Sequence, residues 1–331
     1  MRHIRPQFIP ILGALMLFTT SCEQVIEVEL PEVEQELVVE GRIETGAAPV
    51  VWLGRTQGYF EPLDLAFSDD FFLGGATVTL ERSSAADVVS LQAICTGDLP
   101  EDLLSDISAA VGLPESLLAA ANLCFYTTFD PSWIGEAGET YRLDVELDGA
   151  SVNAITHIPQ PVPMDSVWLD SPGPPDSLGI AYARFSDPDT LGNAYRWFAR
   201  RINRRPDWDP NAGAIKDADF IAPLGSVIDD EFFNGLTFEF TAFRGVQAGS
   251  DAPEDAFDSP EFGYFKVGDT VVVKTCTMDR SVYLALASYE SAILGQGSPF
   301  TVPADMLTNV DGGRGLFAGY AASLDTIIYT P

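Results

Sequence analysis

Alternation of apolar and polar side chains is the feature that most constrains the fold of this chain. In residues 141–147 (Tyr-Arg-Leu-Asp-Val-Glu-Leu), an apolar side chain stands at every second position. A period of two is that of a β-strand with one buried face. The Asp148-Gly149 pair that follows is typical of a tight hairpin turn, so residues 152–158 are expected to form the returning strand. The pattern predicts antiparallel sheet.

Similar short strands are expected along much of the chain, which predicts a mainly β fold. Residues 37–43, 49–53 and 76–80 are strand candidates that precede the hairpin. Together with it they predict a β-sandwich of the immunoglobulin or prealbumin kind over residues 36–160. Residues 98–123 interrupt this pattern with apolar residues at helical spacing, which predicts a helical insertion. The insertion is either a partner-binding lobe or a decorated loop, and the loop is the simpler interpretation.

The second half is expected to form a second β-rich domain over residues 179–331, after a proline-rich linker at 161–178 that contains a short strand. One amphipathic helix is expected over residues 279–294, where apolar side chains recur every three or four positions. Gly312-Gly-Arg-Gly315 lacks the lysine of a phosphate-binding loop and is expected to be a turn. The strand candidates of this half are 166–169, 179–185, 193–203, 236–243, 269–278 and 325–329.

The N-terminus has the pattern of a secretory signal peptide. A positive start and an apolar stretch, Phe8 to Phe18, precede the small residues Thr19-Thr20-Ser21. A cysteine directly after them, Cys22, is typical of a bacterial lipoprotein, whose cysteine thiol receives a diacylglycerol and whose anchor carries acyl chains such as palmitate. The alternative is an ordinary secreted protein with a chance cysteine at its start. We expect residues 1–21 to be a lipoprotein signal peptide, Cys22 to be lipidated and residues 22–35 to form an acidic tether.

Three further cysteines follow Cys22 in the sequence. An envelope compartment outside the inner membrane is oxidising, which permits disulfides. Cys95 and Cys124 flank the expected insertion and are predicted to form a disulfide. Cys276 lies in a strand-like segment and is expected to be a buried core thiol. No spacing of Cys and His suggests a zinc site.

The charge of the chain excludes one class of partner. Asp and Glu total 49 against 18 Lys and Arg, for a net charge of −31. Such a surface repels nucleic acid and anionic lipid headgroups, so nucleic-acid binding is excluded. Acid-rich, lysine-poor surfaces resemble those of salt-adapted organisms. A calcium-loaded surface and a dedicated cationic partner are the alternatives.

Residues 207–219 contain the candidate metal and ligand site. Oxygen-bearing side chains recur there at every second position, which makes Asp207, Asp209 and Asn211 candidate calcium ligands. The glycine stands at the seventh place and the twelfth residue is alanine, unlike an EF-hand, so no cofactor is expected apart from this candidate calcium. Trp208 lies between two aspartates and is a candidate ligand-binding aromatic residue. Asp187 to Asn193 is a second acidic turn, for which an ordinary turn role is the simpler interpretation.

Catalytic candidates are scarce. His157 is the one histidine outside the expected signal peptide, and no nucleophile elbow or oxyanion motif accompanies it. A pair of carboxylates could support glycoside hydrolysis, but with so many acids a chance pair is expected anywhere. We therefore expect a protein that is not an enzyme. Tyr195 and Trp197 are expected to belong to a packed core.

Several segments in order resemble one family, catalogued as domain of unknown function 4249, an uncharacterised lipoprotein family typical of Bacteroidota. The resemblance covers nearly the whole mature chain, while the acidic segments 64–70 and 248–258 and the insertion depart from it. The segments that carry it are Cys22, Leu37-Val-Val-Glu-Gly41, Gly75 to Leu80, Gly138 to Leu143, Ala154 to Pro159, Phe185 to Pro188, Asn193 to Tyr195, Ser281 to Tyr283 and Asn309 to Phe317.

The resemblance implies a location and a role. Members are taken to be outer-membrane lipoproteins, often encoded beside TonB-dependent receptors, which are β-barrels that import large nutrients or chelated metals. The chain is therefore expected to be a lipid-anchored accessory or ligand-capture protein with a β-barrel receptor as its partner. The alternatives are a structural or adhesive envelope lipoprotein and a hydrolase with an unidentified acidic site. Whether it faces the periplasm or the cell surface is left open.

Overall fold

The computed structural model describes residues 34–57, 72–85, 87–104, 118–119, 121–174, 176–204, 215–217, 219–246, 262–295 and 306–330. The expected signal peptide, Cys22 and almost all of the expected tether lie outside these residues. The elements, in order, are β1 (Leu37–Glu44), β2 (Val50–Arg55), β3 (Thr77–Arg82), β4 (Asp87–Cys95), η2 (Thr96–Asp98), β5 (Cys124–Thr127), η3 (Pro131–Trp133), β6 (Thr140–Leu147), β7 (Ala150–His157), β8 (Ser166–Asp170), β9 (Leu178–Ser186), β10 (Ala194–Arg201), β11 (Val227–Asp229), β12 (Thr237–Ala242), β13 (Phe265–Lys266), β14 (Thr270–Met278), α4 (Arg280–Gly295), β15 (Val310–Asp311) and β16 (Arg314–Ile328).

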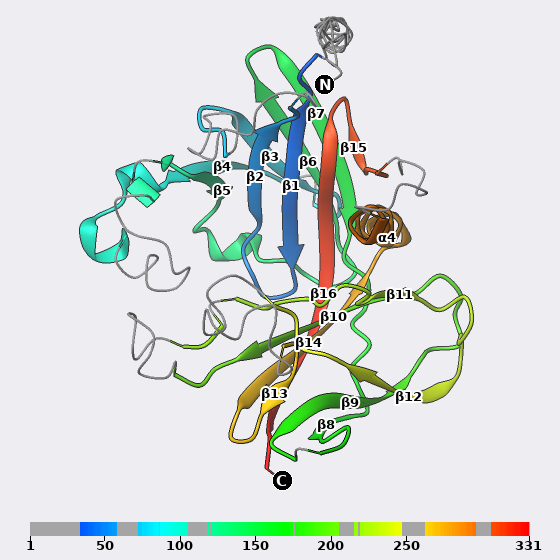
Figure 1. Ribbon diagram of the computed structural model, residues 1–331. Coiled ribbons are helices and arrows are strands. Elements are labelled where there is room, and N and C mark those ends of the chain that lie inside the picture. The colour runs from blue at the N-terminus through cyan, green and yellow to red at the C-terminus, as the bar shows by residue number, and fades with distance from the viewer. Residues whose placement is uncertain are drawn as a thin grey trace, which may run out of the picture.

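Most of the strands belong to one large curled sheet, so the predicted mainly β fold is confirmed (Figure 1). Its strand order is β11-β10-β14-β16-β1-β2-β5-β4-β3-β6-β7-β15. The sheet curls until β7 and β15 contact β16, which encloses a core. The predicted hairpin forms there as β6 and β7, with Tyr141, Leu143 and Val145 buried in that core. The alternation in the sequence thus places one face of β6 and of β7 inside the curl.

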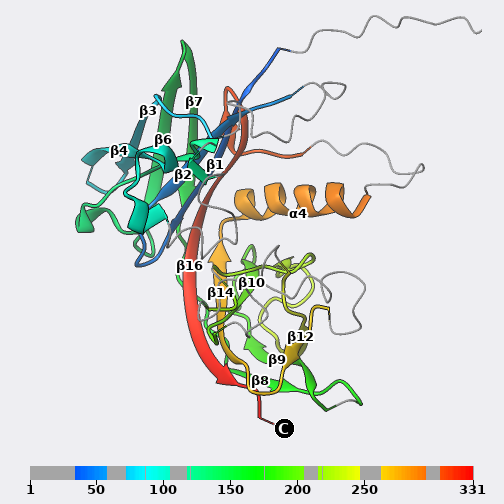
Figure 2. The same ribbon diagram turned by 60° about the vertical axis from the view of Figure 1, so that its left-hand side comes forward.

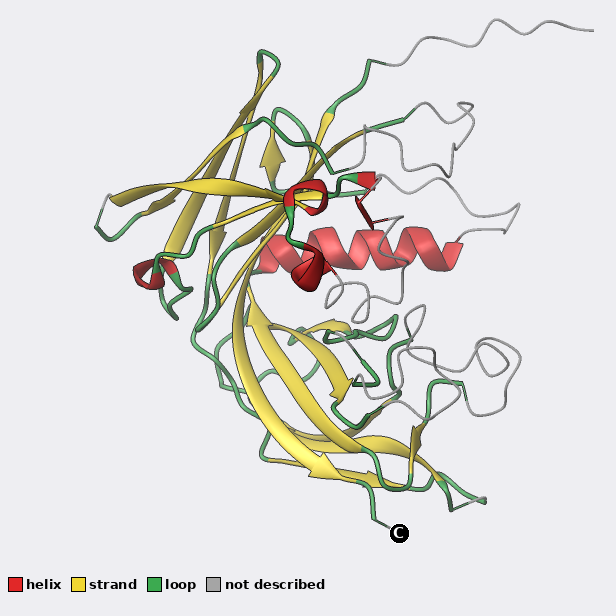
Figure 3. Ribbon diagram, turned by 90° about the vertical axis from the view of Figure 1, so that its left-hand side faces the viewer, coloured by secondary structure: helices red, strands yellow, loops and turns green. Residues whose placement is uncertain are grey.

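A smaller sheet covers the other end of the large one. In it β9 pairs with β8, β12 and β13, all antiparallel. Its inner face packs against β10 and β14 around Trp197, Phe265 and Val273. Figure 3 shows this second layer at the lower end of the molecule, with α4 lying between it and the upper sheet. Helix α4 is fastened to the large sheet through Val282 and Leu286, which pack with residues of β14 and β16.

Strand β16 connects the two ends of the molecule. It pairs in parallel with β1, from Val38 opposite Arg314 to Glu44 opposite Tyr320, and then antiparallel with β14 down to Ile328. Figure 2 shows β16 as one long bent strand that runs from the upper to the lower layer. The two-domain division and the immunoglobulin-like topology expected from the sequence are not confirmed, because one continuous sheet contains strands from both halves. Local patterns could not reveal this pairing between the first and last strands.

An ion pair made by a buried lysine reinforces the joint between the halves. Lys274 Nζ on β14 lies 2.7 Å from Glu44 Oε2 at the end of β1. The same ammonium group lies over two aromatic rings, 4.7 Å from the centroid of Phe198 and 4.5 Å from that of Phe220. A charge that is removed from water needs such partners, because an unpaired buried charge is strongly destabilising. These contacts therefore stabilise the same joint that β16 forms.

Two sequence expectations differ from the structure. The last strand is expected to begin at residue 325, but in the structure it begins at Arg314. Gly315 belongs to this strand rather than to a loop, because its lack of a side chain lets two backbones pack closely. A Cβ atom at Gly315 would lie 1.9 Å from the carbonyl oxygen of Val39. The helical insertion at 98–123 is not evident: residues 101–104 form one helical turn, residues 118, 119 and 121 are helical, and the rest of the segment from 105 to 120 lies outside the described residues.

Replacement of Gly315 by alanine tests the β1–β16 joint. Gly315 has φ +108°, and its new Cβ would overlap the Val39 backbone. We expect Gly315→Ala to lower the free energy of unfolding by about 3 kcal/mol or more, since left-handed strain and overpacking add. Gly149→Ala is the matched control, because its φ is +85° with nothing within 4 Å of the new Cβ, and we expect a loss of about 1 kcal/mol. Equal losses in urea denaturation would show that the close approach does not matter.

Candidate functional site

The candidate calcium and ligand residues lie in a segment whose two ends the structure describes. Asp207, Trp208, Asp209 and Asn211 themselves lie outside the described residues, so these predictions are not tested. Arg204 and Ile215, on either side of the segment, form an antiparallel bridge. The base of residues 205–214 is therefore closed, and the contacts that hold it can be examined.

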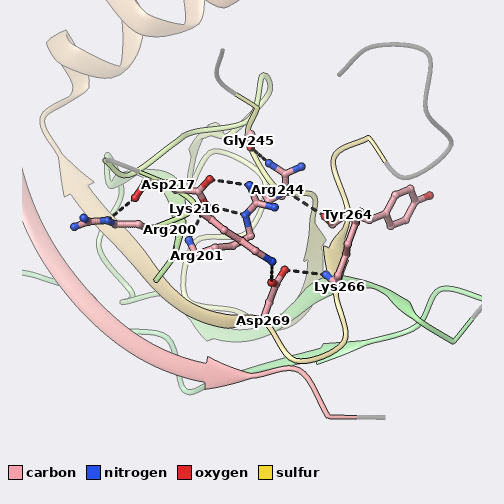
Figure 4. Close-up of polar contacts among 9 residues, drawn as sticks. All are labelled: Arg200, Arg201, Lys216, Asp217, Arg244, Gly245, Tyr264, Lys266 and Asp269. Atoms are coloured by element: carbon pink, nitrogen blue, oxygen red, sulfur yellow. Dashed lines mark hydrogen bonds and ion pairs between the residues drawn. The ribbon is translucent and has the colours of Figure 1, made fainter. Parts of the chain in front are cut away.

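A buried ion pair fixes this base. Arg201, the last residue of β10, forms a two-pronged contact with Asp217: its Nη2 donates to Oδ1 at 2.8 Å and its Nε to Oδ2 at 3.0 Å. Both side chains are almost fully buried, with 3% and 1% exposed. The Arg201 backbone N–H also donates to Asp217 Oδ2 at 2.7 Å, and Arg200 Nε donates to the Asp217 carbonyl oxygen (Figure 4). Three donors thus satisfy one carboxylate, as a buried charge requires.

A second carboxylate extends the same cluster. Lys216 Nζ donates to Asp269 Oδ1 at 2.8 Å, and the Lys266 backbone N–H donates to the other oxygen at 2.9 Å. Arg244 lies beside them, where its guanidinium donates to the carbonyl oxygens of Tyr264 and Gly245 (Figure 4). We call Arg201, Lys216, Asp217 and Asp269 the ion-pair platform. It ties together the chain that leaves β10 and the start of β14.

The platform holds backbone in place, because its two carboxylates accept hydrogen bonds from the backbone N–H groups of Arg201 and Lys266. The sequence did contain a signal for it: arginine stands at positions 200, 201, 204 and 205 in a chain with only 18 basic residues. Basic residues so concentrated in an acidic protein indicate a local need for ion pairs. Only the structure shows that Asp217 and Asp269 are the acidic partners in these ion pairs.

Substitution of Asp217 tests the platform. Asp217→Ala would leave Arg201 buried beside a cavity, so we expect a loss of about 3–5 kcal/mol in the free energy of unfolding. The control is Glu36→Ala, which removes a pair with Arg314 in which the glutamate is 46% exposed, and there we expect about 1 kcal/mol or less. Urea denaturation of both variants measures the difference. A loss from Asp217→Ala no larger than that of the control would contradict a stabilising platform.

The second acidic turn has an ordinary structural role. Asp187 accepts hydrogen bonds from the Tyr195 hydroxyl at 2.5 Å and from the Gly235 backbone at 3.0 Å. Asp189 accepts one from the Asn234 amide. Among the residues that the structure describes, no group of three or more His, Cys, Asp or Glu side chains could hold a metal ion. The oxygens of Asp187 therefore serve the protein's own donors.

The aromatic residues Tyr195 and Trp197 lie in the core, as predicted. Trp197 packs edge-on against Phe240, and Tyr195 lies edge-on against Phe185 with ring centroids 4.8 Å apart. Burial, and then the hydrogen bond to Asp187, raise the pKa of Tyr195, so its hydroxyl stays protonated and donates to that carboxylate. These rings stabilise the contact between the two sheets rather than line a binding surface.

His157 and Cys276 both lie on strands of the large sheet. His157, on β7, contacts the Thr140 hydroxyl through Nδ1 at 3.1 Å. Cys276, on β14, is a buried free thiol, as predicted. Burial raises its pKa to about 12, against the opposing effect of Lys274. Because the thiolate is the nucleophile, a thiol with so high a pKa is inert at neutral pH.

The inertness of Cys276 can be measured in a Cys22→Ser variant, where it is the one cysteine outside a disulfide. At pH 8 its thiol is protonated in the folded state, since pH 8 lies far below a pKa of about 12. We expect iodoacetamide to label the unfolded protein at least about a hundredfold faster than the native protein. Native labelling as fast as that of the unfolded chain would show that the thiol is accessible and ionised.

Cys95 and Cys124 form a disulfide in the structure. They are opposite each other at the ends of β4 and β5, where these strands pair. Further contacts close the same place: the Leu123 backbone donates to the Thr96 hydroxyl at 2.8 Å, and that hydroxyl donates to the Leu118 carbonyl at 2.6 Å. The segment between the cysteines is therefore held at both ends.

The fold and these contacts define a mainly β protein whose buried charged groups hold backbone and loops in place. The chain belongs to the family described as domain of unknown function (DUF4249), whose model matches residues 23–324. No curated protein matches the sequence. In the described part of the chain, no helix has the length and apolar character needed to cross a bilayer.

Proposed function

We propose that this protein is a lipid-anchored accessory or ligand-capture protein of the outer membrane that works with a TonB-dependent receptor and is not an enzyme. The observation that carries the proposal is the N-terminal pattern that ends at Cys22. The match to the family begins at the next residue, Glu23. Residues 23–36 separate Cys22 from the start of β1 at Leu37, which is enough chain for a tether between bilayer and fold.

The charge of the protein supports a covalent anchor. A net charge of −31 opposes adsorption to anionic headgroups, so a membrane location needs another source of affinity. Acyl chains provide it, at about 0.8 kcal/mol for each buried CH₂ group. Several chains on Cys22 would hold the protein at a bilayer despite electrostatic repulsion.

The contacts of the candidate reactive groups support a non-enzymatic role. His157 bonds a threonine hydroxyl, and Cys276 is buried with a raised pKa. The buried carboxylates Asp187 and Asp217 accept hydrogen bonds from the backbone and from neighbouring side chains. The two carboxylates are thus committed to holding the fold.

Replacement of Cys22 tests the anchor. We expect Cys22→Ser to abolish incorporation of radiolabelled palmitate and to move the protein from the membrane pellet to the soluble fraction, because the thiol that accepts diacylglycerol is gone. Ser21→Ala is the control, since it keeps a small residue before the cysteine and should leave both properties unchanged. Wild-type protein without label, or a Cys22→Ser variant that stays in the membrane pellet, would refute the anchor.

Receptor association needs a separate measurement. The wild-type protein, solubilised in mild detergent from the membranes of the cells that make it, is expected to purify with a β-barrel protein that mass spectrometry identifies as a TonB-dependent receptor. Purification without any barrel would remove the receptor from the proposal while leaving the anchor in place. It would favour the alternative of a structural or adhesive envelope lipoprotein.

A further inference from the structure

Two neighbouring loops present large apolar side chains to solvent. One loop, residues 187–193, connects β9 to β10, and the other, residues 230–236, connects β11 to β12. Phe232 is 88% exposed, Leu191 78% and Leu236 55%. We call these two loops the loop pair. A single exposed apolar residue is ordinary, whereas three on two joined loops form a candidate contact surface.

Buried carboxylates hold the loop pair in one conformation. Asp230, only 1% exposed, accepts hydrogen bonds from the backbone of Gly192 and of Asn193 across the gap between the loops. From the first loop, Asp187 accepts a hydrogen bond from the backbone N–H of Gly235 in the second loop. The backbones are also joined directly, from the Asp187 N–H to the Leu236 carbonyl and from the Asp230 N–H to the Asn193 carbonyl. Each loop therefore supports the other.

This construction lowers the cost of binding. A loop that is ordered before it meets a partner loses less conformational entropy than one that orders on contact. Burial of an exposed phenylalanine or leucine also removes apolar area from water, and aromatic residues that enter a pocket commonly dominate the affinity of an interface. Phe232 contributes little to the stability of the fold, because its side chain lies almost wholly in solvent. Its apolar area can therefore be buried against a partner.

The charges of the loop pair indicate the chemistry of that partner. Asp189 and Glu231 are exposed beside the apolar side chains. A second copy of this chain would bring like charges together, since each copy carries −31, and an anionic bilayer would repel the loops for the same reason. A protein with arginine or lysine around an apolar pocket complements both the apolar and the acidic residues.

We propose that the loop pair docks into an apolar pocket, bordered by basic side chains, on a partner protein, with Phe232 and Leu191 as the inserted residues. This assigns a contact surface, and so goes beyond the proposed function. It depends neither on lipidation of Cys22 nor on the partner being a receptor, so the tests of Cys22 and of the barrel can fail without affecting it.

The experiment places a photo-crosslinking amino acid at position 232 of the full chain, in the cells that make it. The expected result is a crosslink to one protein, absent when the same amino acid replaces Phe129, which is 74% exposed but lies in the loop before η3. Affinity is then measured with the purified crosslinked protein. Phe232→Ser and Leu191→Ser are each expected to weaken binding at least about tenfold, with Phe129→Ser below about twofold. Association is also expected to slow as salt is raised.

Several results would overturn the proposal. One is crosslinking at 232 no stronger than at 129, and others are adducts to lipid alone or to a second copy of this chain. Unchanged affinity in Phe232→Ser would show that the loop pair is near the partner without docking into it. An association rate that does not change with salt concentration would contradict the basic side chains proposed around the partner's pocket. Unfolding curves of the serine variants that match the wild type show that the loss is local to the surface.

Discussion

The parallel pairing of β1 with β16 is the contact on which the rest of the structure depends. It joins the first and last strands of the described fold, and the continuation of β16 then pairs with β14. Through β14 it positions β10 and α4, and through its upper part it completes the core around Phe317. Parallel strands need a long connection, and here the connection is almost the whole chain. The sheet can therefore close only when both ends of the chain are present.

The acidic residues of this protein divide into two physical classes. Asp187, Asp217 and Asp230 are buried, and each accepts several hydrogen bonds that fix a strand end or a loop. Exposed carboxylates such as Asp189 and Glu231 add to the negative surface. The buried class determines where loops are held, and the exposed class makes the surface negative. The loop pair contains both classes within a few residues, which is why it combines rigidity with an acidic border.

Prediction from the sequence succeeded where the determinant was local. The hairpin of residues 141–157, the strand at 269–278 and the helix after Asp279 follow from periodicity and turn residues, and the structure has all three. Prediction failed where a glycine could belong either to a turn or to a close contact between two strands. Gly315 looks like a turn residue, but it is needed because β16 passes too close to Val39 for a side chain. The ion-pair platform was missed for a related reason, since Arg201 and Asp217 are ordinary surface residue types until burial is known.

The sequence by itself determined the β-rich class, several of the strands, the acidic character and the family, because these depend on composition, on periods of two and on ordered motifs. Tertiary structure alone decided that strands from both halves form one sheet, that Asp217 and Asp230 are buried, and that Phe232 is exposed. The physical reason is that burial and strand partners are properties of distant contacts. The sequence pattern around a phenylalanine in a short loop is the same whether the side chain is buried in a core or exposed to solvent. Only the packing around it distinguishes the two.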